Sequence, residues 1–209
     1  SSIPQNNGNL AAEKGPGCDI SHRFAHSAVY EIPQVEGSPA VRALTRNWQL
    51  SAVYQAQTGF PFTISVFGDT ANSGTVLGVN PIRANTTGQP IFGPNSHTAS
   101  QWFNPAAFGP APDCRQQTVF NSLSNPLVCF GDAGRNILSG PGLVNFDFAL
   151  LKRFNVTETH RIEFRTEIFN FTNTPPLGLP VNTLTNPSVG RILGAGRARE
   201  IQFALRYSF

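Results

Sequence analysis

Alternation of apolar and polar residues is the feature that most constrains this chain. The clearest stretch covers residues 159–171, where four charged side chains alternate with side chains that are mostly apolar. The charged positions are Arg161, Glu163, Arg165 and Glu167, and the intervening positions are Ile162, Phe164, Thr166 and Ile168. Because successive side chains of a strand point to opposite faces, the stretch predicts a strand with one charged and one apolar face.

Four further stretches show the same period of two, over residues 23–32, 47–58, 143–154 and 200–209. Each is long enough to cross an apolar layer when tilted. We find no stretch of ten or more residues with an apolar stripe at helical spacing and both a start and a stop signal. The sequence therefore predicts an all-β fold with five long strands and no helix.

Two long connections separate these strands, over residues 59–142 and 172–199. The first contains 11 Gly and 9 Pro but only six charged residues, so we expect an elaborate loop rather than a core. A three-residue turn at 156–158 is expected between the third and fourth strands, since an odd number of residues keeps both apolar faces on one side. In an antiparallel meander both long loops then leave the same end of the sheet.

Long strands with one aromatic-rich face, and long loops at one end only, are typical of the wall of an outer-membrane barrel. Five strands cannot close such a barrel, and open edges are not tolerated in lipid. We therefore expect residues 1–209 to form a single, incomplete barrel segment that other chains or further sequence complete.

Composition narrows the function further. Charged residues make up 13% of the chain, with 17 Phe and no Met, which argues against a typical cytosolic enzyme and predicts a piece of a longer polypeptide. No run of about 18 apolar residues predicts a membrane-spanning helix, and no signal peptide is evident. A net charge of +3 with scattered Lys and Arg predicts no nucleic-acid partner.

Residues that could carry chemistry are sparse. His22 and His26 share a strand face but lack a supporting Asp, Glu or Cys, so we expect no metal site. No catalytic or phosphate-binding motif occurs, so we expect neither enzyme activity nor a cofactor. Cys114 and Cys129 either form a disulfide, which would indicate an oxidising compartment, or remain unpaired thiols together with Cys18.

Three segments carry a resemblance to a known family. They are the final ten residues EIQFALRYSF, the block GDAGRNILSGPG at 131–142 that leads into NFDF, and WFNPAAF at 102–108. The chain resembles the C-terminal barrel region of a TonB-dependent outer-membrane receptor, of the type with an N-terminal carboxypeptidase-regulatory-like domain. The resemblance covers residues 23–209 and implies an outer-membrane location and uptake of a ligand.

The resemblance also implies roles for particular residues. The alternating apolar residues of the last strand resemble the signal that the barrel assembly machinery reads, at Ile201, Phe203, Leu205, Tyr207 and Phe209. The charged side chains would line the lumen wall, at Asp147, Arg161, Glu163, Arg165, Glu167 and Arg206, although a charged ladder facing water fits any half-buried sheet equally well. The implied partners are the assembly machinery and an energy-coupling protein.

Two alternatives to the receptor stay open at this stage. A processed fragment could pair with copies of itself through its free strand edges and build an extracellular tube or filament. A soluble sandwich or adhesion module is the third interpretation, and it would have to bury the many Phe residues in a core.

Overall fold

The computed structural model describes residues 5, 10–13, 15, 17, 20–68, 82–111 and 130–209. Contacts within the chain group it into two compact units. The single barrel segment expected over residues 1–209 stays a prediction. The sheet unit comprises Ser21–Thr58, Gly142–Pro176 and Ala195–Phe209. The loop unit comprises Ser1–Ile20, Gly59–Pro141 and Leu177–Gly194. We describe each unit by itself.

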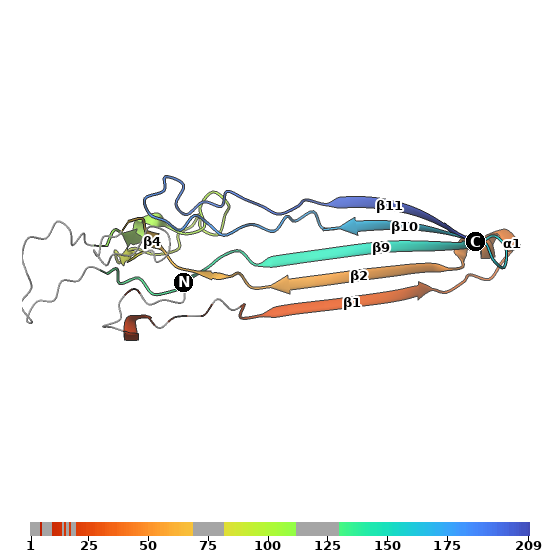
Figure 1. Cartoon of the computed structure of the whole chain (residues 1–209), viewed down its shortest axis with the longest axis horizontal. Coiled ribbons are helices and arrows are strands. Elements are labelled where there is room, and N and C mark those ends of the chain that lie inside the picture. Colours follow the sequence, from red (N-terminus) through yellow and green to blue (C-terminus); the bar gives the residue numbers. More distant parts are fainter. Residues whose placement is uncertain are drawn as a thin grey trace, which may run out of the picture. The chain divides into compact units, whose positions relative to one another are not determined.

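The sheet unit is a five-stranded antiparallel sheet in the order β1-β2-β9-β10-β11 (Figure 1). Each strand pairs with the strand of this sheet that comes before or after it in the sequence. The strands are β1 (Arg23–Ile32), β2 (Trp48–Gln57), β9 (Leu143–Asn155), β10 (Arg161–Phe169) and β11 (Glu200–Ser208). All five predicted strands are confirmed, and their ends agree with the prediction to within two residues. The meander topology is confirmed as well.

Both long connections start from one end of this sheet, as predicted. Gln57 pairs with Leu143, and Phe169 pairs with Glu200, at what we call the loop end. The opposite, turn end carries the connections at 33–47 and 156–160. The predicted three-residue turn at 156–158 is wrong, because β10 begins only at Arg161, two residues later than predicted, and five residues separate it from the end of β9 at Asn155. Five is also odd, so the apolar faces of both strands still coincide.

The prediction of no helix is also wrong, because the connection at the turn end contains α1 (Pro39–Thr45). Ser38 caps its start by accepting a hydrogen bond from the Val41 N–H, and Pro39 occupies the first turn, where its missing N–H is harmless. The helix has seven residues. It is therefore shorter than the ten-residue stretch that the sequence criterion required.

The loop unit has a core of its own, so the expectation of a loop without a core is wrong. Three pairs of two-residue strands bring distant segments together: β3 (Pro61–Phe62) with β8 (Leu138–Ser139), β4 (Ser65–Val66) with β5 (Ile82–Arg83), and β6 (Asn85–Thr86) with β7 (Phe108–Gly109). The described residues of this unit also form two short 3-10 helices, η1 (Leu10–Glu13) and η2 (Pro105–Ala107). The buried core residues are Phe62, Ile64, Val66, Ala84, Phe103, Ala107, Phe108, Ala133 and Leu138.

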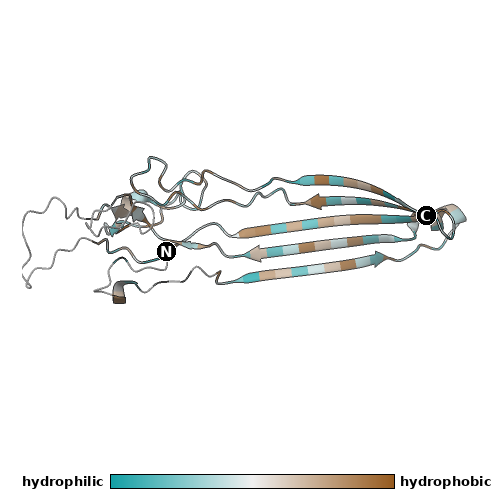
Figure 2. Ribbon diagram, in the orientation of Figure 1, coloured by the Kyte–Doolittle hydropathy of each residue, from teal (hydrophilic) through white to brown (hydrophobic). Residues whose placement is uncertain are grey.

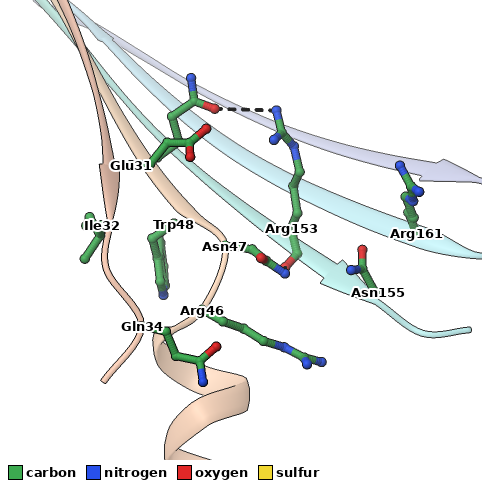
Figure 3. A pocket seen from close by; sticks show the side chains of 10 residues that line it. Glu31, Ile32, Gln34, Arg46, Asn47, Trp48, Arg153, Asn155 and Arg161 are labelled. Carbon is green, nitrogen blue, oxygen red and sulfur yellow. Dashed lines mark hydrogen bonds between the residues drawn. The ribbon is translucent and has the colours of Figure 1, made fainter. Parts of the chain in front are cut away.

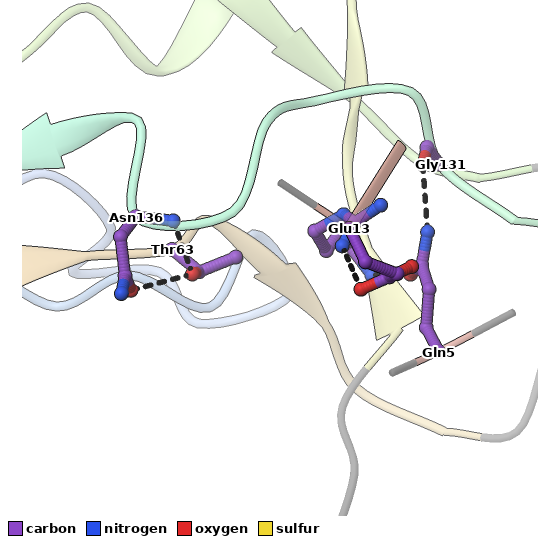
Figure 4. Close-up of polar contacts among 6 residues, drawn as sticks. Gln5, Glu13, Thr63, Gly131 and Asn136 are labelled. Carbon is purple, nitrogen blue, oxygen red and sulfur yellow. Dashed lines mark hydrogen bonds and ion pairs between the residues drawn. The ribbon is translucent and has the colours of Figure 1, made fainter. Parts of the chain in front are cut away.

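Polar contacts tie the N-terminal segment and the 131–142 block into the loop unit (Figure 4). Glu13 forms a buried ion pair with Arg83 at 2.7 Å. The Gln5 side chain donates to the Gly131 carbonyl and accepts from the Arg83 N–H, both at 2.9 Å. The Asn136 N–H donates to Thr63 Oγ1 at 2.8 Å, and that hydroxyl donates to Asn136 Oδ1 at 3.0 Å. These contacts join segments that lie at least 70 residues apart in the sequence.

Candidate functional site

The register of the five strands gives the sheet two chemically different faces. Even-numbered residues of β1, β2, β9 and β10 share one face with odd-numbered residues of β11, and we call this side the apolar face. The remaining strand residues form the polar face. Figure 2 shows the consequence as alternating hydrophilic and hydrophobic positions along the strands. The sheet is therefore built to separate two environments.

Large apolar side chains are exposed on the apolar face. The exposed fraction is 70% for Phe203 and 74% for Leu205, and about half for Ile201 and Tyr207. Phe209, the fifth residue of the predicted assembly signal, follows β11 and is 90% exposed. Contiguous exposed apolar surface of this kind marks a contact with a membrane or another protein. The face needs an apolar neighbour that the sheet unit does not itself supply.

The height of the apolar face matches a membrane. On β9 it extends from Val144 to Phe154, about 33 Å along the strand at about 3.3 Å per residue. With the tilt of about 40° found in outer-membrane barrels, this length spans about 25 Å, the height of their outward-facing apolar band.

Aromatic rings occur near both ends of this band. Near the loop end, Tyr54 lies between Phe24 and Phe146, with ring centroids 6.0 and 6.5 Å apart. At the turn end, the Tyr207 ring stacks on His160 at 5.7 Å, and its hydroxyl lies 2.6 Å from His160 Nδ1. Barrels of the outer membrane carry such aromatic girdles at both interfaces, because these rings suit the boundary between lipid and water.

The polar face brings together all six residues that the sequence assigns to the lumen wall: Asp147, Arg161, Glu163, Arg165, Glu167 and Arg206. Glu163 lies in register between Arg153 and Arg206, and its carboxylate pairs with the Arg153 guanidinium at 3.2 Å. Arg165 pairs with Glu167 at 2.8 Å. The charges thus alternate across and along the strands, which limits repulsion between them.

Asp147 differs from the other five because its hydrogen bonds fix the backbone at a strand end. Its carboxylate accepts hydrogen bonds from the Asn170 N–H at 2.8 Å and from the Asn145 side chain at 2.9 Å. Asn170 follows β10 directly and has a positive φ of 49°. Asp147 therefore holds the backbone where β10 ends and the long connection begins.

Two cavities lie along this face. The turn-end cavity has a volume of about 450 Å³ and lies between the ends of β1, β2 and β9 (Figure 3). Three arginines and one glutamate contribute its charges: Arg46, Arg153, Arg161 and Glu31. A cavity of about 480 Å³ at the loop end is lined in part by Asp147, Arg197 and Glu200. Both cavities contain charged side chains of either sign, but only the lining of the turn-end cavity is mainly polar, and apolar side chains such as Leu143 and Phe169 contribute to the loop-end cavity.

Among the strand residues of the apolar face, Lys152 is the only lysine, arginine or carboxylate, and sequence reasoning missed it. Its side chain is fully buried, with 2% of the residue exposed. The ammonium donates to the carbonyls of Ala43, Leu44 and Arg46 at 3.1, 2.9 and 2.6 Å. It also lies 5.0 Å from the ring centroids of Trp48 and Phe154. The sequence did carry a signal: every second residue of β9 is apolar, and Lys152 interrupts that series.

Three other predictions from the sequence concern the cysteines, a metal site and membrane-spanning helices. Cys18, Cys114 and Cys129 lie outside the described residues, so the disulfide stays a prediction. His26 lies on the apolar face beside the Phe24 ring, and across the described ranges no three His, Cys, Asp or Glu side chains gather as metal ligands would. In the same part of the chain, every helix is too short or too polar to span a membrane.

Comparison with known proteins agrees with the two-faced sheet. Searches of curated proteins and of solved structures gave no significant match. The family model for the outer membrane beta barrel domain matches residues 1–202, nearly the whole chain. This match supports an outer-membrane location and lends no support to an extracellular filament. The antiparallel sheet and an apolar face as tall as the apolar layer of a membrane agree with this match. The chain belongs to the outer membrane beta barrel domain family.

Proposed function

We propose that this chain forms part of the barrel wall of a TonB-dependent receptor that takes up a ligand across the outer membrane. The observation that carries the proposal is the sheet unit, with one apolar and one polar face and both long connections at a single end. The receptor type rests on the resemblance of the segments at 102–108, 131–142 and 200–209 to the TonB-dependent family, specifically to receptors with a carboxypeptidase-regulatory-like domain.

In this proposal the apolar face contacts lipid and the polar face lines the barrel interior. Outer-membrane barrels have short periplasmic turns and longer extracellular loops, so the turn end faces the periplasm and both long connections face outward. β1 and β11 are the edge strands of the described sheet, and neighbouring strands of the complete barrel pair with them.

The packed core of the loop unit supports a role in ligand capture. Loops are generally more mobile than the elements they connect, whereas here Phe62, Phe103 and Phe108 hold several segments around one core. Binding residues work best when a rigid framework holds them in position. The ligand would first meet this framework outside the cell and then pass to the charged interior wall.

The proposal assigns transport rather than catalysis, and no cofactor. Energy would come from an energy-coupling protein in the periplasm, and the barrel assembly machinery would insert the chain by reading the apolar positions of β11. The charged residues of the polar face, including Arg161 and Glu163, would contact polar groups inside the barrel.

Depletion of compounds from a rich growth medium would test the transport proposal. Cells that produce the full parent protein would be compared with cells that lack either this protein or the energy-coupling protein, with mass spectrometry of the medium. A set of compounds that disappears only when both proteins are present supports coupled uptake. Depletion that does not depend on the energy-coupling protein would show that the receptor assignment is wrong.

A further inference from the structure

Helix α1 is attached to the apolar face of the sheet at its turn end. The Lys152 side chain belongs to that face, and its ammonium donates to three carbonyls at the C-terminal end of the helix. Trp48, directly opposite Lys152 in the register, adds a hydrogen bond from its indole N–H to the Leu44 carbonyl at 2.6 Å. The end of α1 therefore lies on the side of the sheet that carries the apolar residues.

In this attachment the Lys152 ammonium uses all of its hydrogen-bond donors. An ammonium has three N–H donors, and the three carbonyls of Ala43, Leu44 and Arg46 use all of them. The C-terminal end of a helix carries a partial negative charge, which favours a cation there. The rings of Trp48 and Phe154 cover the remaining sides of the charge. A buried lysine with all its donors used holds the helix in one place.

Apolar and basic side chains are exposed on α1. Leu44 is 67% exposed and Val41 is 38% exposed, although both belong to a helix that is fixed to the sheet. Arg42 is exposed beside them, and the helix sequence PAVRALT contains no acidic residue. Helices that lie in a membrane interface also combine exposed apolar side chains with basic residues.

We propose that α1 is an interfacial helix that contacts the phospholipid of the leaflet at the turn end of the barrel. Leu44 and Val41 lie at the boundary of the acyl chains, and Arg42 contacts lipid phosphate groups. Lipid is the occupant, rather than a protein partner, because the exposed surface of α1 continues the face that contacts lipid along the strands. This inference rests on the proposed membrane-spanning role of the sheet.

Photo-crosslinking tests this contact in the full parent protein. Benzoylphenylalanine would be placed singly at Leu44, at Leu150 on the apolar face and at Ser51 on the polar face. Each protein would be folded into vesicles of phosphatidylethanolamine and phosphatidylglycerol, and adducts would be identified by mass spectrometry. We expect lipid adducts at positions 44 and 150 in amounts within about twofold of each other, and at least tenfold less at position 51.

The outcomes separate this inference from the proposed function. Lipid adducts at Leu150 without adducts at Leu44, or protein adducts alone at Leu44, would overturn the interfacial role of α1 and leave the barrel wall intact. Absence of lipid adducts at Leu150 itself would overturn the barrel wall and this inference together.

A charge reversal outside the sheet tests the phosphate contact. Arg42→Glu changes an exposed side chain, so it leaves folding intact while it repels anionic headgroups. We expect this change to lower the lipid adduct at position 44 at least threefold in vesicles with phosphatidylglycerol, and to leave the adduct at position 150 unchanged. An unchanged adduct at position 44 would contradict the contact between Arg42 and lipid phosphate.

Discussion

Replacement of Leu150 by Arg tests which face of the sheet contacts lipid. Leu150 lies on the apolar face of β9, in register with Leu50 and Thr166. It is four residues from Phe154 and six from Val144, which correspond to depths of about 10 and 15 Å in a tilted strand. The substitution therefore places a guanidinium near the middle of the membrane.

The expected penalty follows from that depth. An arginine on the lipid face of a barrel costs about 2–4 kcal/mol at the midplane. Since about 1.4 kcal/mol is a factor of ten, the folding equilibrium of Leu150→Arg should fall about 30-fold to 700-fold. Urea unfolding of the parent protein in phospholipid vesicles, followed by the gel mobility of folded and unfolded forms, measures this change.

The adjacent residue supplies a matched control. Ala149 lies on the polar face, opposite Ser51 and Glu167, so Ala149→Arg places the same charge beside a carboxylate. An exposed ion pair contributes about 0–1 kcal/mol, and the control should therefore change the free energy of unfolding by no more than about 1 kcal/mol. A penalty for Ala149→Arg that equals or exceeds the penalty for Leu150→Arg would refute the assignment of the two faces.

Three other substitutions probe separate parts of the account. Tyr207→Asp should lower the amount of folded protein in isolated outer membranes severalfold, whereas Ser208→Asp on the opposite face should keep it within twofold; equal loss would count against the assembly signal. Gly131→Ala should destabilise the loop unit by about 1–3 kcal/mol in limited proteolysis, because its Cβ would overlap two backbone carbonyls, and Gly93→Ala, with open space around it, should not. Glu163→Gln should cost less than about 1 kcal/mol in urea unfolding and nothing at high salt, since its ion pair is partly exposed; a loss above 2 kcal/mol would be inconsistent with this exposure.

The sheet was predictable because its strands carry their own pattern. Residues such as Arg161 and Ile162 repeat a period of two that only a strand with two different faces satisfies. The turn between β9 and β10 was harder to predict, because its parity follows from that pattern and its length does not. The charged residues of the polar face were predictable as a set on one face, whereas the backbone role of Asp147 depends on Asn170, which the pattern does not place beside it.

The loop unit and α1 were not predictable by the same reasoning. The strands of the loop unit are two residues long, and partners such as Phe62 and Leu138 lie far apart in the sequence. Their short apolar runs, interrupted by Gly and Pro, show no period. The role of Lys152 depends on backbone carbonyls of α1 that only the folded connection brings to it. Contacts of this kind come from tertiary packing rather than from local sequence.

Lipid accessibility along β9 tests the central claim most directly. Nitroxide labels placed one at a time at positions 146–151 of the parent protein, folded in phospholipid vesicles, report collisions with oxygen from the lipid and with a nickel chelate from water. We predict alternation, with high oxygen accessibility at 146, 148 and 150 and high nickel accessibility at 147, 149 and 151. Uniform accessibility, or lipid contact at the odd positions, would contradict a barrel wall with these two faces.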